Sequence, residues 1–335
     1  MVKTSKSMAY IKLLRLPLLL LIAASQLIVH YLFTTNIVRL DYDLPLLQLV
    51  LIIATTASIA AGGFVINDYY DMRIDEINHP LKRIVGNEIE KHQVMNLYIG
   101  LFIISIVLSL ALGFVSGNFS NSFILATVIG LLWFYSSSYK RTLVIGNLII
   151  SLAVALIPFF LAIYESKYIM PWYAEKLTMN GIVVTFEKLN EATPTITANY
   201  IIVGYVSLFV FATTFVHEII RSLYEEKGER EMECHSFPIV YGQNTAKLIC
   251  YAMLALINIV CFVSIINNFE VLRLNTVSYY LCTVMALSGA LVMFLKSAEN
   301  PKDYNICLTI AKLLIFSGVA YGIIYALNNP NDYIG

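Results

Sequence analysis

The chain consists of long apolar runs separated by shorter polar segments, and this pattern repeats from one end to the other. A helix that crosses a bilayer needs about 20 mostly apolar residues. Runs of this kind predict about nine spans, at residues 10–34, 45–67, 94–115, 122–138, 143–164, 199–220, 246–267, 275–295 and 306–327. They are too long for transmembrane strands and lack the alternation of such strands. We therefore expect an all-α, polytopic membrane helix bundle that forms a single domain over residues 1–335.

Composition agrees with a membrane protein. Hydrophobic residues make up 59% of the chain and charged residues only 13%, whereas a soluble domain carries roughly 25% charged residues. The formal net charge is zero, so no basic field favours binding to nucleic acid. The five cysteines lack the spacing of metal or redox motifs, and we interpret them as packing residues.

The placement of lysine and arginine predicts the orientation. With the N-terminus inside, 17 of the 22 Lys and Arg residues fall on the cytoplasmic side of the predicted spans, as the positive-inside rule requires. We therefore expect a multi-pass protein of the plasma membrane whose active-site mouth opens to the cytoplasm. Residues 68–93 and 221–245 are expected as cytoplasmic active-site loops, and residues 165–198 as an extracytoplasmic insertion.

A first polar cluster lies where the second apolar run ends, in the stretch NDYYDMRID. Asn67, Asp71 and Asp75 are four residues apart, which places them along one face of a helix, and Asp68 lies beside them. Carboxylates this close repel one another and resist leaving water. A positive partner is therefore expected at this end of the helix.

A second polar stripe lies where the sixth apolar run ends, in the stretch HEIIRSLYEEKGERE. Its members share one face of a helix and are Glu218, Ser222, Glu225 and Glu229. An even number of crossings separates the two stripes, so both reach the same side of the membrane. One such cluster is also typical of a solvated helix end, but two favour a functional site. Hard oxygen ligands suit Mg²⁺. The candidate metal ligands are Asn67, Asp68, Asp71, Asp75, Glu218, Ser222, Glu225 and Glu229, and the candidate catalytic residues are Asn67, Asp71, Asp75, Glu225 and Glu229.

Basic residues accompany both stripes. Acids bridged by a metal, with lysine and arginine alongside, fit a diphosphate, because the metal neutralises the phosphate oxygens and arginine binds them with paired donors. For Lys140, a simple anchor at the membrane surface is an equally good interpretation. The candidate diphosphate ligands are Arg15, Lys82, Arg83, Lys140 and Arg221.

The two stretches resemble motifs of a known family. The first, NDYYDMRIDEINHP, is similar to the N-x-x-x-D-x-x-x-D signature of the UbiA-type intramembrane prenyltransferases, and Lys82 and Arg83 continue the likeness. The second, HEIIRSLYEEKGEREMECHSFPIVYG, resembles the second aspartate motif of that family. It departs from the usual pattern, because Ser222, Glu225 and Glu229 stand where aspartates are common. The resemblance covers nearly the whole chain.

The resemblance implies a bundle around a central chamber and a Mg²⁺-dependent prenyl transfer. The tail of a prenyl diphosphate donor is expected in an apolar tunnel and its head at the acidic motifs, where ionisation gives an allylic cation that a lipophilic acceptor attacks. Gln26, Tyr139 and Asn147 are candidate residues for the acceptor. Hydrogen bonding between helices is an equally good role for Gln26 and for His30.

The resemblance also bears on the class of acceptor. The stretches RLPLLLLIAASQ, INHPLKRIVGNEI and CHSFPIVYG look most like the geranylgeranylglycerol-phosphate geranylgeranyltransferase branch. An aromatic quinone precursor, of the hydroxybenzoate or naphthoate type, is the alternative acceptor. A catalytically impaired lipid-binding homologue also remains open, because Ser222 carries no charge. His79 and His235 lack the spacing of zinc ligands and are interpreted as solvated.

Overall fold

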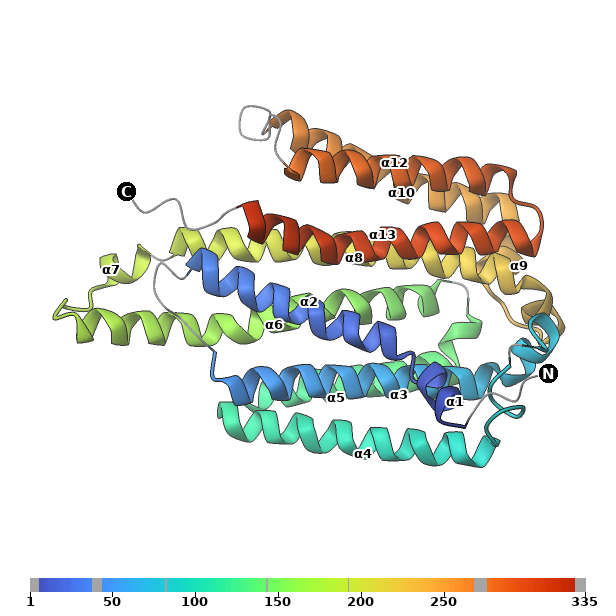
Figure 1. Cartoon of the computed structure of the whole chain (residues 1–335), viewed down its shortest axis with the longest axis horizontal. Coiled ribbons are helices and arrows are strands. Elements are labelled where there is room, and N and C mark those ends of the chain that lie inside the picture. The colour runs from blue at the N-terminus through green and yellow to red at the C-terminus, as the bar shows by residue number, and fades with distance from the viewer. Residues whose placement is uncertain are drawn as a thin grey trace.

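The computed structural model describes residues 6–37, 44–81, 83–142, 144–191, 193–267 and 276–328. Within these ranges the protein is built from long helices that lie side by side in layers (Figure 1). In chain order they are α1 (Lys6–Leu13), α2 (Leu16–Ile37), α3 (Leu46–Asn78), α4 (Lys91–Ser116), α5 (Phe119–Ser137), the 3-10 turn η1 (Tyr139–Arg141), α6 (Ile145–Met179), α7 (Phe186–Asn190), α8 (Thr193–Glu231), α9 (Phe237–Tyr241), α10 (Gln243–Asn267), α12 (Thr276–Ser297) and α13 (Pro301–Asn328).

The predicted membrane bundle is confirmed. Among the described residues, eight helices are long and apolar enough to cross a membrane, and α1 with α2 makes a ninth if this bent pair counts as one span. The two parts meet at an angle of 44°. Arg15 lies at the bend with a φ of 52°, in the left-handed region. A residue other than glycine held there costs about 1–3 kcal/mol, so the surrounding structure must support it.

Three segments expected to lie outside the spans are more helical than predicted. α3 continues to Asn78 and α8 to Glu231, so the segments expected as loops at 68–93 and 221–245 begin as helix. The segment expected as an insertion at 165–198 is also mostly helical, and there the ends of α6 and α8 extend past the other helices beside α7 (Figure 1). Counting apolar residues ends a span at the first charges, whereas tertiary contacts let the helix continue through them.

α8 connects the two halves of the bundle. It packs against α3, α6 and α2 on one side and against α10 and α13 on the other. One apolar core lies among α2 to α6 and α8, and a second lies among α8, α10, α12 and α13. Between the helices lies a chamber of about 570 Å³, lined by residues of α2, α3, α5, α6, α8 and α13. We call the end of the bundle where α3 and α8 terminate, on the right in Figure 1, the acidic end.

A side-chain clamp joins α3 to α8 at the acidic end. Asn78 Nδ2 donates to the carbonyl oxygen of Glu225 at 3.0 Å, and the backbone N–H of Gly228 donates to Asn78 Oδ1 at 3.0 Å. A Cβ atom on Gly228 would lie 2.6 Å from Asn78 Nδ2 and 2.9 Å from the carbonyl oxygen of Ile74. Glycine therefore permits the close approach that brings the two stripes together.

Substitution of this glycine tests the clamp. We expect Gly228→Ala to destabilise the protein by about 1–3 kcal/mol, because the added methyl group must displace Asn78 or the α3 backbone. The measurement is thermal unfolding in detergent. The matched control is Gly204→Ala on the same helix, where a Cβ atom meets nothing within 4 Å. That control is expected to be neutral or to stabilise by up to about 1 kcal/mol, and equal melting temperatures for Gly228→Ala and wild type would contradict the clamp.

Candidate active site at the mouth of the chamber

The chamber is apolar along most of its length and charged at one part of its wall, which we call the mouth. The apolar lining includes Leu21, Ile59, Leu125, Ile157 and Phe160. The charged residues of the mouth are Arg15, Asp68, Asp75, Glu218, Arg221, Glu225 and Lys312, with Asn67 and His217 beside them.

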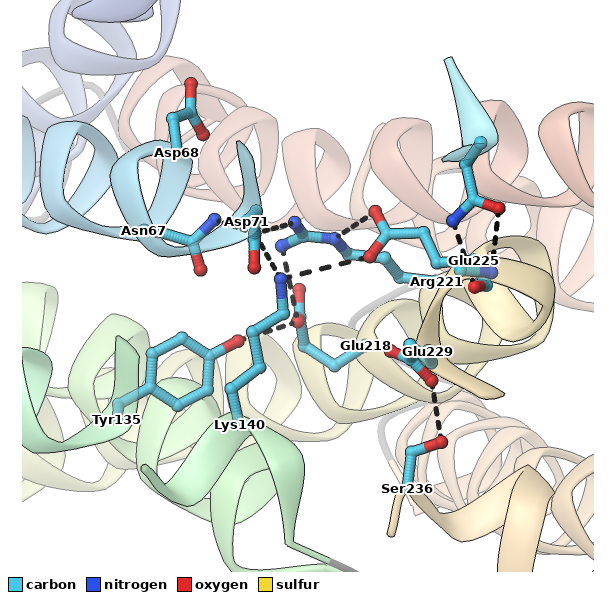
Figure 2. A network of polar contacts seen from close by, with 12 residues as sticks. Asn67, Asp68, Asp71, Tyr135, Lys140, Glu218, Arg221, Glu225, Glu229 and Ser236 are labelled. Carbon is cyan, nitrogen blue, oxygen red and sulfur yellow. Dashed lines mark hydrogen bonds and ion pairs between the residues drawn. The ribbon is translucent and has the colours of Figure 1, made fainter. Parts of the chain in front are cut away.

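Asp71 lies directly behind the mouth at the centre of a polar network (Figure 2). Its Oδ2 atom accepts a hydrogen bond from Asn67 Nδ2 at 2.7 Å and another from Arg221 Nη2 at 3.2 Å. It also forms a salt bridge with Lys140. Only 5% of the Asp71 side chain is exposed, and a carboxylate buried this deeply needs such partners to remain charged. The structure thus supplies the positive partners that the sequence required.

Arg221 connects the two acidic stripes. Its Nε atom donates to Glu225 Oε1 at 2.9 Å, and its Nη1 atom lies 3.8 Å from Glu218 Oε2. Through Nη2 the same guanidinium contacts Asp71 on α3. The planar fork of arginine presents several donors in fixed directions, so one side chain compensates carboxylates from two helices.

Lys140 supplies the second cation from η1, between α5 and α6. Besides the salt bridge to Asp71, its Nζ atom lies 3.8 Å from Glu225 Oε2. Burial and the nearby Arg221 favour loss of its proton, but Asp71 and Glu225 outweigh both and hold the pKa of Lys140 above its ordinary value. Lys140 is therefore a cation at neutral pH and more than a surface anchor.

Two residues at the mouth were not singled out in the sequence. The hydroxyl of Tyr135 donates to Glu218 Oε2 at 3.3 Å, and His217 Nδ1 lies 3.1 Å from Glu218 Oε1. Tyr135 belongs to the same polar stretch as Lys140, and His217 directly precedes Glu218. These positions next to predicted site residues are the feature of the sequence that could have identified Tyr135 and His217. Glu218 is thereby held on three sides, which fits the expectation that it takes part in the site.

Arg15 and Asp68 face each other across the mouth. Arg15 Nη2 lies 2.7 Å from Asp68 Oδ1, and the guanidinium lies 5.0 Å from the centre of the Phe64 ring. These contacts support the left-handed backbone at Arg15. Asp75 lines the chamber as well, so all four polar positions of the first stripe lie at or directly behind the mouth.

Part of the second stripe faces elsewhere. Glu229 is buried, and its Oε2 atom accepts a hydrogen bond from Ser236 Oγ at 2.6 Å (Figure 2). Among the described residues that line the chamber, neither Glu229 nor Ser222 is included. The helical period places these residues near the stripe, but the packing of α8 turns them away from the chamber.

Of the two remaining basic candidates, Arg83 and Lys82, the structure describes only Arg83. Arg83 Nη1 forms a salt bridge with Glu76 Oε2 at 3.0 Å. Arg83 is not part of the chamber wall as far as the described residues define it. Lys82 lies outside the described residues.

The acceptor candidates are likewise dispersed. Gln26 is fully buried, and its Oε1 atom accepts a hydrogen bond from Thr56 Oγ1 at 2.8 Å, which is the helix–helix role considered above. In the described part of the wall, Tyr139 and Asn147 are both absent.

His79, His235 and His30 have different surroundings in the structure. The prediction that His79 is solvated is wrong, because its ring stacks on Tyr224 with centroids 4.8 Å apart. His235 is exposed, as predicted. His30 Nδ1 lies 2.7 Å from Glu165 Oε1, so it too makes a contact between helices.

The oxygen donors of the site suit a hard cation that arrives with its own ligands. Asn67 Oδ1 is buried and has no hydrogen-bond partner among the described residues. In the same part of the chain, no three His, Cys, Asp or Glu side chains are grouped closely enough to hold a metal alone. Magnesium is often bound by one or two carboxylates together with substrate phosphates, and Asn67, Asp75 and Glu225 fit that kind of partial ligand set.

Comparison with known proteins agrees with this geometry. Residues 32–313 match the model of the UbiA prenyltransferase family. A digeranylgeranylglyceryl phosphate synthase of Sulfurisphaera tokodaii is 24% identical over 288 residues, which cover 85% of this chain and 90% of the relative.

Solved structures share the fold. A structure of digeranylgeranylglyceryl phosphate synthase superposes with a TM-score of 0.60 at 19% identity and covers 97% of this chain and 99% of its own. A UbiA homologue from Archaeoglobus fulgidus bound to DMAPP and Mg²⁺ gives a TM-score of 0.54 at 16% identity, covering 96% and 99%. With the family match over most of the length, the chain is a multi-pass integral membrane protein that belongs to the UbiA prenyltransferase family.

Proposed function

We propose that this prenyltransferase moves a geranylgeranyl group from its diphosphate to the hydroxyl group of geranylgeranylglyceryl phosphate, in a Mg²⁺-dependent reaction. The observation that carries the proposal is the meeting of carboxylates from α3 and α8 with Lys140 and Arg221, at the mouth of an apolar chamber. Digeranylgeranylglyceryl phosphate synthases are among the relatives that match most of this chain.

The cations of the mouth are suited to exchange partners when the donor arrives. Lys140 and Arg221 compensate Asp71 and Glu225 in the structure. A bound diphosphate offers these cations stronger, multiply charged acceptors. Asp71, Glu225, Asn67 and Asp75 are then free to hold Mg²⁺, which supplies neutralisation of the leaving group. A UbiA homologue from Archaeoglobus fulgidus is bound to DMAPP and Mg²⁺, which supports a prenyl diphosphate and Mg²⁺ as the ligands of this site.

The chamber accommodates the isoprenyl tail. The α3 residues that line it run from Thr56 to Asp75, which corresponds to about 28 Å along a helix. At the end away from the mouth lie Phe160, whose ring centroid is 6.4 Å from that of Tyr164, and the hydrogen bond between Thr56 and Gln26. Thr56 and Phe160 line the chamber there and are expected to limit the length of the donor.

The chemical step is the ionisation of the donor in a site that excludes water. The bond between C1 of the donor and its diphosphate oxygen breaks, and the electron pair leaves with the diphosphate that Lys140 and Arg221 hold. The acceptor hydroxyl oxygen forms the new bond to C1, and its proton passes to the released diphosphate. Apolar residues around the chamber exclude water that would capture the allylic cation.

The orientation proposed from the sequence places the acidic end in the cytoplasm. The excess of lysine and arginine on that side supports it, as does the need for a water-soluble diphosphate leaving group to depart. Residues 1–335 then form one integral-membrane domain of the plasma membrane, with the segment 165–198 on the opposite side.

The first test removes the charge of Asp71 without changing its shape. We expect Asp71→Asn to lower turnover by about 10²–10³-fold, the usual cost of removing one electrostatic stabiliser. The measurement is transfer from radiolabelled geranylgeranyl diphosphate to geranylgeranylglyceryl phosphate by purified protein, with Mg²⁺ and after chelation. Glu231→Gln, at the exposed end of α8, is the control and should behave as the wild type.

Several outcomes would count against this function. Turnover of Asp71→Asn equal to that of wild type removes Asp71 from the mechanism. Diphosphate release that continues unchanged after chelation contradicts the Mg²⁺ dependence. Transfer to a hydroxybenzoate or naphthoate, with none to geranylgeranylglyceryl phosphate, contradicts the acceptor assignment.

The second test concerns chamber length. Ala60 lines the chamber between its two ends, and Ala60→Phe should block a long tail while leaving room for a short one. We expect turnover of geranylgeranyl diphosphate to fall about tenfold or more relative to dimethylallyl diphosphate. Ala126→Phe makes the same change at an exposed position of α5 and should leave this ratio unchanged. An unchanged ratio in Ala60→Phe would show that the tail lies elsewhere.

A further inference from the structure

Lys312 is a cation in the chamber wall that the proposed donor site does not use. It lies within α13, inside the span that the sequence predicts at 306–327, and it lines the chamber. No described residue forms a salt bridge or hydrogen bond with its ammonium group. Ionisable side chains within membrane-spanning helices are costly and rare, and those that face a cavity usually mark a binding site or path.

The surroundings of Lys312 leave positive charge in excess. The charged groups that act on it are Arg15, Arg221 and Glu218. Glu218 is already engaged by Arg221 and by His217. The charged lining residues of this part of the wall are three cations, Arg15, Arg221 and Lys312, against two carboxylates, Glu218 and Glu225. A ligand that carries negative charge would be attracted to the excess of positive charge.

Arg15 is the second available cation of this wall. Its guanidinium is held by Asp68 at 2.7 Å and by the ring of Phe64, yet 33% of the side chain is exposed. Arginine carries five N–H donors, and the contact with Asp68 uses only part of them. Arg15 directly precedes α2, which packs against α13, and Arg15 and Lys312 both line the chamber.

We propose that Lys312 and Arg15 bind the phosphate group of the acceptor lipid, an assignment that rests on the proposed prenyl transfer. The donor diphosphate is assigned to Lys140 and Arg221, which sit with Asp71 between α3 and α8. Two phosphate-bearing groups repel strongly in a site of low dielectric constant. Binding them through different pairs of cations, Lys140 with Arg221 and Lys312 with Arg15, gives each phosphate group its own compensating charge and lets the acceptor hydroxyl face the donor carbon.

The test compares a phosphorylated acceptor with the same lipid lacking phosphate. We expect Lys312→Gln to raise the KM for geranylgeranylglyceryl phosphate about tenfold or more, the usual effect of losing a charge-assisted hydrogen bond. The KM for geranylgeranyl diphosphate and the KM for geranylgeranylglycerol should stay unchanged. Lys312→Arg retains the charge and should restore most of the affinity. Lys302→Gln, at an exposed position in the first turn of α13, is the control.

A binding measurement distinguishes failure of the phosphate site from failure of the proposed reaction. The affinity of the full-length protein in detergent for geranylgeranylglyceryl phosphate can be measured by calorimetry without donor. Weaker binding to Lys312→Gln than to wild type supports the phosphate site even if no transfer occurs, in which case only the proposed reaction fails. Equal affinity of Lys312→Gln and wild type for the phosphorylated lipid overturns the proposal, and so does an increase confined to the KM of the donor.

Discussion

The arrangement of this protein depends on the compensation of buried carboxylates by Lys140 and Arg221. Asp71 comes from α3, Glu218 and Glu225 come from α8, and all three side chains are less than 10% exposed. Without cations, such groups would repel one another and would favour water over the bundle. With two cations among three carboxylates, the cluster retains a formal negative charge that a divalent ion can neutralise. The same contacts that hold the helices together thus prepare the site for a metal and a diphosphate.

The fold brings the carboxylates and the cations close enough for this compensation. α3 and α8 both continue beyond their apolar runs, and the Asn78 clamp on Gly228 holds their ends in close contact. The bend at Arg15 turns a third element toward the mouth. Charged residues therefore gather at one end of a chamber whose other surfaces are apolar, which is the separation that an amphiphilic substrate requires.

The sequence predicted the parts of the site that follow from helical periodicity. Asn67, Asp71 and Asp75 share a face, and so do Glu218 and Glu225, because residues four or seven apart always do. Periodicity does not say which way a face turns, and Glu229 and Ser222, predicted as metal ligands, are not among the described residues that line the chamber. Arg83 and Tyr139 are likewise not among the described lining residues, since the basic or polar character of a residue does not reveal its tertiary partner.

Other features of the site depend on tertiary contacts that the sequence does not reveal. Tyr135 and His217 contact Glu218 and line the chamber, which the sequence alone does not show. Lys312 falls in the span predicted at 306–327, but only its position in α13 shows that it lines the chamber. Span number and fold class were predictable, since apolar runs of sufficient length have few alternatives in a bilayer.

A double-mutant cycle between Asp71 and Arg221 tests the central interaction most directly. The free energy of unfolding would be measured in detergent, without donor or Mg²⁺, for Asp71→Asn, Arg221→Met and the double variant. If one guanidinium compensates carboxylates of both helices, the double variant should be less destabilised than the sum of the single variants by about 1 kcal/mol or more. Additivity within about 0.5 kcal/mol would show that the two side chains do not interact and would contradict the account.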